Sequence, residues 1–408
     1  GLGPGSRIVS INGQAVGDLP TGDIRVCLDA EPLPVTLGLG LPLDLPTVRP
    51  RKLRRNPVTV CTAHCRGSYR VVSDAIALLG WREIQAEARD ASLMWLEHAD
   101  STDGLAPVQT MSRLEAFLSF CKKARLAQSL NPWIGELPGE FSFSPRTWVL
   151  PYDAADLEAA MARGGGGART YIAKPTGGCQ GRGIVLVRKW RDLADIIQRS
   201  RALGDATGQR QSVAEYVVQQ YISQPLLLDG LKFDLRLFVV VTSLVPMRAY
   251  LYKEGLGRFC TVPYQPPGEG NLRDKCMHLT NYAVNKHNKD FQASEGLAQH
   301  AEGSKRSASA VFRQIEQSHG VSAEELWEKV ARLAANTLMS LRPGLVEFYV
   351  NDRAKPLHPV GPKGFQIIGL DILLGSDLQP VLLELNANPS LSATQPSAGP
   401  EAAVAGAA

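Results

Sequence analysis

The chain has 408 residues, of which 44% are hydrophobic and 21% are charged, and its formal net charge is +4. This composition is typical of globular proteins and excludes a disordered or fibrous protein over most of the length. No apolar run approaches the roughly 18 residues of a transmembrane helix, and no signal-peptide pattern is present. The seven scattered cysteines indicate a reducing compartment rather than a disulfide scaffold. Because the first residue is Gly1 and not Met, we expect a fragment or an incomplete gene model.

The N-terminal segment differs in pattern from the rest. Residues 7–11 alternate as a short strand, and Asn12-Gly13 then gives a hairpin-turn signal. The segment resembles the middle of a PDZ domain without its carboxylate-binding strand, so residues 1–40 are interpreted as a partial PDZ-like segment. Residues 41–57 are predicted to be a Pro-rich, basic linker, and residues 392–408 a disordered tail rich in Ala, Gly, Ser and Pro.

Between these segments, residues 58–391 show mixed helical and strand patterns. Helical periodicity is found over 73–79, 111–130 and 323–341. Apolar, β-branched runs typical of buried strands are found over 213–221, 235–241, 365–374 and 380–385. These patterns predict a mixed α/β region, and the chain is long enough for one large domain of several lobes or for two or three domains.

A glycine-rich loop lies between two strand-like runs, from Lys174 to Ile184. Glycines let backbone N–H groups approach a phosphate, and Lys174 supplies a charge for phosphate oxygens. The lysine precedes the glycines, so the loop is not a Walker A motif. On its own the pattern fits an ordinary glycine-rich hairpin equally well.

Polar residues also interrupt two apolar strands. The first, Gln219-Gln220-Tyr221-Ile222, ends a buried strand in amides that suit a purine edge. In the second, alternation places Lys232, Asp234 and Arg236 on one face. Such charges are costly in a sheet unless they face a site or pair with one another. The alternative, an edge strand with a solvated face, conflicts with the long apolar continuation.

Two acidic residues, Asp371 and Glu384, lie in apolar strands that a short polar turn joins. Antiparallel pairing would bring the carboxylates together, and Asn386 shares a face with Glu384. Two carboxylates and an amide oxygen suit Mg²⁺ bound with nucleotide phosphates, whereas the alternative is a pair of strand-end carboxylates that cap loops. Arg258, in a polar run with aromatic anchors, would suit a carboxylate or a surface ion pair.

Taken together and in order, these motifs resemble the tubulin–tyrosine ligase-like family, most closely its polyglutamylase branch. The motifs run from Lys174-Pro175 through Lys232–Arg236 and Glu254–Phe259 to His278–Tyr282 and Glu384–Pro389. The resemblance spans roughly 58–391 and implies an ATP-grasp fold, with nucleotide between two α+β lobes.

The resemblance also implies roles for individual residues. Contacts to ATP would come from Lys174, Gln180, Gly181, Gln219, Gln220, Tyr221, Ile222, Lys232, Phe233, Asp234, Thr280 and Asn281. Mg²⁺ would be held by Asp371, Glu384 and Asn386, and the amino acid by Gln180, Arg258, Tyr282 and Lys305. Arg236 would act in catalysis together with Lys174 and Glu384.

The activity implied is an ATP- and Mg²⁺-dependent ligase that adds free L-glutamate to glutamate side chains of tubulin C-terminal tails through an acyl phosphate. The implied location is the cytoplasmic microtubule cytoskeleton, including the cilium or basal body, without nucleic acid or membrane partners. Alternatives are a tubulin glycylase, a tyrosine ligase, an ATP-grasp ligase with another acceptor, and a non-catalytic tubulin-binding scaffold.

Overall fold

The computed structural model describes residues 58–63, 65, 70–85, 91–96, 110–163, 169–177, 181–206, 216–292, 302–351 and 364–391. For 7–11, 14–15, 37–40, 199–206 and 351 the backbone alone is described. Of the predicted segments, the linker, the tail and the Asn12-Gly13 turn lie outside this part of the chain. In the PDZ-like segment, β1 (Arg7–Ile11) pairs antiparallel with β2 (Gln14–Ala15) and β3 (Leu37–Gly40), as the strand prediction requires. The PDZ resemblance stays a prediction.

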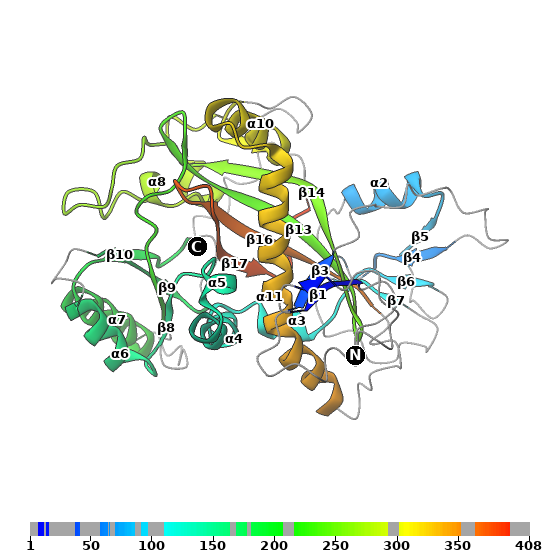
Figure 1. Ribbon diagram of the computed structural model, residues 1–408, viewed down its shortest axis with the longest axis horizontal. Coiled ribbons are helices and arrows are strands. Elements are labelled where there is room, and N and C mark those ends of the chain that lie inside the picture. Colours follow the sequence, from blue (N-terminus) through cyan, green and yellow to red (C-terminus); the bar gives the residue numbers. More distant parts are fainter. Residues whose placement is uncertain are drawn as a thin grey trace.

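A small parallel sheet begins the larger domain (Figure 1). Its strands are β5 (Arg82–Ile84), β4 (Thr59–Cys61), β6 (Leu93–Met94) and β7 (Thr110–Met111), in that spatial order. Helix α2 (Arg70–Leu78) connects β4 to β5 and buries Val72 and Ile76.

The second sheet is antiparallel and provides one wall of the site. Its order is β10 (Val185–Val187), β9 (Tyr171–Pro175), β11 (Tyr216–Gln220) and β8 (Thr147–Leu150). Helices α6 (Ala154–Arg163) and α7 (Trp190–Ala206) lie together on one side of it (Figure 1). The apolar side chains of these strands and helices form a separate core that includes Trp148, Leu157 and Leu193.

The third sheet is antiparallel and provides the opposite wall. Its order is β15 (Lys305–Ser307), β14 (Met247–Phe259), β13 (Leu231–Leu244), β16 (Gln366–Leu374) and β17 (Pro380–Asn386), with β12 (Leu227–Leu228) beside β13. The helices of this lobe are α3 (Ala116–Phe120), α4 (Lys123–Glu136), α5 (Pro138–Phe141), α8 (Lys275–His278), α9 (Tyr282–Asn285), α10 (Ala308–His319) and α11 (Ala323–Asn351). Figure 1 shows α11 crossing the sheet over β13 and β16.

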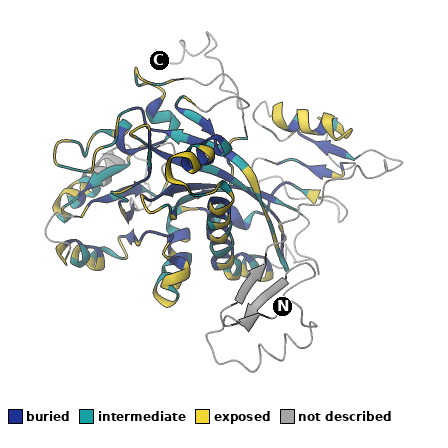
Figure 2. Ribbon diagram, turned by 45° about the horizontal axis from the view of Figure 1, so that its top comes forward, coloured by how far each residue is buried: buried dark blue, intermediate teal, exposed yellow. Residues whose placement is uncertain are grey.

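Alternation along β13 divides its residues between two faces. Leu235, Leu237, Val239 and Val241 are at most 1% exposed and pack in the core with α3, α10 and α11. Figure 2 shows this buried layer inside the exposed outer surfaces of the helices. The polar residues of β13 are therefore directed to the other face, which is the face of the site.

Most predicted elements are confirmed: the helices over 73–79 and 323–341 and the strands over 235–241, 365–374 and 380–385 all form. The strand predicted over 213–221 is described from Tyr216 to Gln220. The single helix predicted over 111–130 is wrong, because Lys122 adopts an extended backbone (φ −65°, ψ 136°) that separates α3 from α4. None of the helices in the described part of the chain combines the length and the apolar character needed to span a bilayer.

Candidate active site

A cleft of about 650 Å³ lies between the second and third sheets. On the side of the second sheet, Lys174 on β9 donates a hydrogen bond to Gln219 Oε1 at 2.9 Å, and Gln219 Nε2 donates to Thr147 Oγ1 at 3.0 Å. Burial lowers the pKa of Lys174, although the nearby charge of Glu384 acts in the opposite direction. A buried ammonium with one neutral partner is well suited to bind an anion in the cleft.

Lys232 on β13 also lines this cleft, beside the rings of Tyr221 and Tyr264. Its ammonium donates to Tyr221 OH at 2.9 Å and to the His278 carbonyl oxygen at 3.0 Å, and it lies 4.3 Å from the centre of the Tyr221 ring. Burial lowers the pKa of Lys232 to about 8. Lys232 is therefore a second cation whose charge depends on pH near neutrality.

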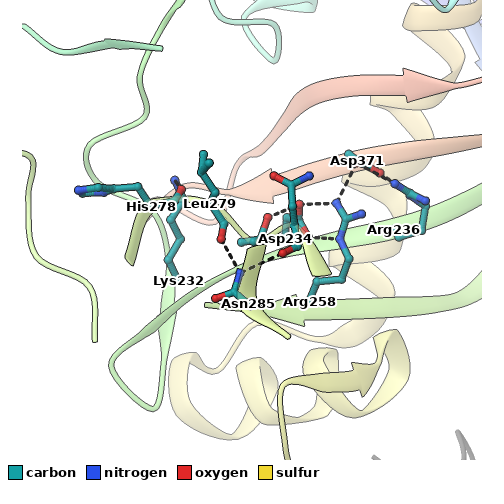
Figure 3. Close-up of polar contacts among 10 residues, drawn as sticks. Lys232, Asp234, Arg236, Arg258, His278, Leu279, Asn285 and Asp371 are labelled. Carbon is teal, nitrogen blue, oxygen red and sulfur yellow. Dashed lines mark hydrogen bonds and ion pairs between the residues drawn. The ribbon is translucent and has the colours of Figure 1, made fainter. Parts of the chain in front are cut away.

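The centre of the site is a network of arginines and carboxylates (Figure 3). Arg258 on β14 donates to both oxygens of Asp234, at 2.7 and 2.5 Å, and to Asp371 Oδ2 at 2.8 Å. Arg236 holds Asp371 from the other side through a bidentate pair. Burial acts to raise the pKa of Asp371, but the two guanidiniums outweigh it and hold the pKa well below its usual range. Thr280 completes the network by donating to Asp234 Oδ2 at 2.6 Å.

Strand register produces this network. β13 pairs with β16 so that Arg236 is opposite Asp371, and β16 pairs with β17 so that Asp371 is opposite Glu384. Antiparallel partners share a face, so Arg236, Asp371 and Glu384 form one row across three strands. The predicted meeting of Asp371 and Glu384 is confirmed by this pairing.

The donor set of Asp371, Glu384 and Asn386 fits a hard divalent cation. Burial, followed by repulsion from Asp371, raises the pKa of Glu384, and the charge of a bound divalent cation would relieve this repulsion. Two carboxylates and an amide are the ligands that Mg²⁺ takes beside nucleotide phosphates. In the described part of the chain no group of three His, Cys, Asp or Glu side chains could hold a metal, so the amide oxygen is needed as the third donor.

Residues 103–399 match the model of the tubulin-tyrosine ligase family. The chain belongs to this family. Its α+β lobes and the cleft between them agree with the ATP-grasp fold implied by the sequence motifs.

Curated relatives in the family are tubulin polyglutamylases. Human tubulin polyglutamylase TTLL13 is 35% identical over 347 residues, which cover 84% of this chain and 39% of that protein. Zebrafish tubulin polyglutamylase ttll6 is 36% identical over 327 residues (79% and 38%), and human tubulin polyglutamylase TTLL11 is 35% identical over 343 residues (83% and 46%). The chain thus spans less than half the length of these relatives.

Three residues predicted to hold the amino acid lie together in this family member. Arg258 on β14 pairs in register with Lys305 on β15, and the Lys305 ammonium lies 4.1 Å from the centre of the Tyr282 ring. Burial, and then the charge of Arg258, lowers the pKa of Lys305. Gln180 lies outside the described residues, so its predicted role stays a prediction.

The remaining predicted nucleotide contacts surround the cleft. Its lining includes Gln219, Gln220, Tyr221, Ile222, Lys232, Asp234, Thr280 and Asn281. Phe233 is directed away from it into the core, stacked on Phe259 at 5.1 Å, so a side-chain contact with nucleotide is excluded for this residue by alternation along β13. Gly181 has φ +79°, and a Cβ there would lie 2.9 Å from Val284, so only glycine fits.

Sequence reasoning missed Thr147 and Lys123. Thr147 positions Gln219. Burial lowers the pKa of Lys174 and raises that of Glu384, and the charge of Lys123 at the start of α4 adds to the first shift and opposes the second. Neither residue belongs to a motif with a chemical signature. The sequence indicated only that Lys123 lies in a predicted helix, and a lysine in a helix is usually a solvated surface charge.

Proposed function

We propose that the protein is an ATP-dependent ligase that adds glutamate to glutamate side chains of tubulin C-terminal tails. The observation that carries the proposal is the cleft, where the buried cations Lys174 and Lys232 face the row of Arg236, Asp371 and Glu384. Cations suit the phosphates of ATP, and the carboxylates suit the metal ion that accompanies them. Membership of the tubulin-tyrosine ligase family and the names of its polyglutamylase relatives support tubulin as the acceptor.

The charge around the cleft favours an acidic acceptor. A neighbouring cleft of about 830 Å³ adjoins Glu384 and Asn386 and is also lined by Lys122, Lys123 and Arg182. These basic side chains complement a glutamate-rich tail approaching the γ-phosphate end of the nucleotide site. Such an acceptor would place the protein at the microtubule cytoskeleton.

The proposed reaction has two transfers. An acceptor carboxylate oxygen attacks the γ-phosphorus of ATP, the bond to the β–γ bridging oxygen breaks, and ADP leaves. The amine of free glutamate then attacks the acyl carbon and loses a proton, inorganic phosphate leaves, and an isopeptide bond forms. Lys174 neutralises charge on the transferred phosphoryl group, and Arg236 stabilises the acyl phosphate.

The other residues bind and position the reactants. Lys232 contacts phosphate or ribose, while Arg258, with Lys305 and Tyr282, receives the carboxylates of the incoming amino acid. Asp371, Glu384 and Asn386 would hold Mg²⁺, which neutralises phosphate charge when it is bound. Because the arginines are already fixed by Asp234 and Asp371, little reorganisation is required when the substrates arrive.

The test is incorporation of radiolabelled glutamate into microtubules with Mg-ATP, beside Glu384→Gln and parallel glycine and tyrosine reactions. We expect glutamate incorporation that Glu384→Gln abolishes. Label from glycine or tyrosine would retain the ligase chemistry and overturn the donor. Absence of label from all three, with ATP bound, would refute a tubulin ligase and favour a non-catalytic scaffold or another acceptor.

A further inference from the structure

The face of the third sheet that carries the active site continues beyond it. Along β13, residues of one parity share a face, so Phe238 and Val240 follow Lys232, Asp234 and Arg236 on the same side. At about 3.3 Å per residue, Phe238 and Val240 lie about 7 and 13 Å past Arg236. Figure 1 shows β13 and β14 extending together past the centre of the lobe.

Strand register gives this continuation a floor of apolar and aromatic side chains. Phe238 is opposite Tyr252 on β14 and Gly369 on β16, and Val240 is opposite Tyr250 and Ile367 in the next row. We call Phe238, Val240, Tyr250, Tyr252 and Ile367 the aromatic platform. The first of these rows reaches Asn386 on β17, because Gly369 pairs with it. The platform therefore begins one row from Asp371 and Glu384.

The two tyrosines of the platform are exposed and its other three side chains are half-buried, whereas comparable side chains on the opposite face are buried. Tyr250 is 47% and Tyr252 is 61% exposed, whereas Leu237 and Val239 on the core side of β13 are at most 1% exposed. Among the described residues, β15 pairs with β14 only at Leu256–Arg258, so no described strand covers the edge of β14 beside the tyrosines. An open strand edge next to exposed aromatic side chains is suited to bind an extended peptide.

Charge and shape indicate which peptide fits. Arg236 lies at the end of the platform nearest the active site, and the exposed Arg248 follows Tyr250 on the same face of β14. Gly369 has no side chain, and Pro389 and the Arg236 side chain occupy the space beside it, so the segment after β17 borders the platform. Because Arg236 is already paired with Asp371, Arg248 is the basic group of this surface that complements an extended chain carrying carboxylates.

We propose that the aromatic platform binds the acceptor polypeptide beside its modified glutamate, and that the acceptor is an extended acidic peptide. The inference rests on the proposed function for the identity of that peptide. The reactive glutamate would lie at the row of Arg236, Asp371 and Glu384, and residues two to four positions along the acceptor would contact Phe238, Tyr252 and Tyr250. The platform is a binding surface and takes no part in the chemical steps.

The test measures binding separately from catalysis. A fluorescently labelled peptide with consecutive glutamates is titrated with the full chain in the presence of Mg²⁺ and a non-hydrolysable ATP analogue, and anisotropy gives Kd. Tyr250→Ala/Tyr252→Ala is compared with Tyr152→Ala, an equally drastic change at a side chain that is 75% exposed just after β8. We expect Kd to rise about tenfold or more in the double variant and to stay within about twofold in the control.

A second variant, Arg248→Glu, should weaken binding of the same peptide, and the loss should shrink as salt rises. Three results would refute peptide binding by the platform. The first is an equal Kd for wild type and the double variant, and the second is an equal loss of affinity in the double variant and Tyr152→Ala. The third is that wild type does not bind the peptide. ATP-analogue affinity in the double variant checks that the nucleotide site remains intact. If the platform binds the peptide while wild type incorporates no glutamate, the proposed function fails and the docking surface stands.

Discussion

Replacing Arg258 by Met should destabilise the third-sheet lobe by about 3–5 kcal/mol, the usual cost of removing one partner from a buried ion pair. The guanidinium is 12% exposed, and its two partners Asp234 and Asp371 are each 3% exposed. Asp371 keeps Arg236 and Asp234 keeps the Thr280 hydroxyl, so neither carboxylate is left without a hydrogen bond. The charge of Asp234, however, loses its bidentate guanidinium partner, which makes the upper part of the range more appropriate than the lower.

The assay is urea unfolding followed by tryptophan fluorescence, with the free energy of unfolding extrapolated to water at an unchanged m-value. Lys253→Met is the matched control, because Lys253 and Glu324 form an exposed pair in which the side chains are 43% and 58% exposed. That pair should contribute at most about 1 kcal/mol. Adding Asp234→Asn to Arg258→Met should recover part of the loss, since the unpaired charge is removed. Equal losses in Arg258→Met and Lys253→Met would refute the reasoning.

Four further outcomes are expected. The pKa of Lys232 in the folded protein is about 8, below the ordinary value of 10.5. The affinity for ATP, measured by isothermal titration calorimetry, should therefore fall as the pH rises through 8. Lys232→Gln should not show this fall in affinity. Between pH 8 and 10.5 the unfolded chain binds the proton that the folded chain has lost, so the contribution of Lys232 to stability should increase with pH there, and a decrease in urea titrations would contradict the assignment. Gly344→Ala would place a Cβ 2.4 Å from the buried Phe120 ring, and this overpacking should cost about 1–3 kcal/mol in the same unfolding assay despite the better helix propensity of alanine. Removal of Mg²⁺ by EDTA should weaken ATP binding to wild type strongly and to Glu384→Gln only slightly, whereas an equal effect on both would exclude Glu384 as a ligand.

The fold could be predicted from the motifs and the apolar strands, because each motif and each strand is a short local pattern in the sequence. Asp371 and Glu384 could be paired from sequence, since a short turn between two strands leaves only an antiparallel hairpin. The break at Lys122 could not be predicted, because no Gly or Pro marks it and the tertiary packing of α3 and α4 determines it. The position of β13 between β14 and β16 could not be predicted from the sequence either. The contact of Arg258 with Asp371 depends on this strand order, so it could not be predicted.

This long-range pairing also changes what the arginines do. Sequence reasoning treats Arg258 and Arg236 as receptors for substrate charge, whereas in the fold each already binds a buried carboxylate. The carboxylates therefore fix the two guanidiniums before substrate binds, and substrate contacts are made by groups whose orientation is already restricted. Lys174 differs, because it donates to the neutral Gln219 amide oxygen, a weaker acceptor than phosphate. Nucleotide binding can thus exchange the hydrogen bond between Lys174 and Gln219 for one to phosphate, while the arginine–carboxylate network remains as it is.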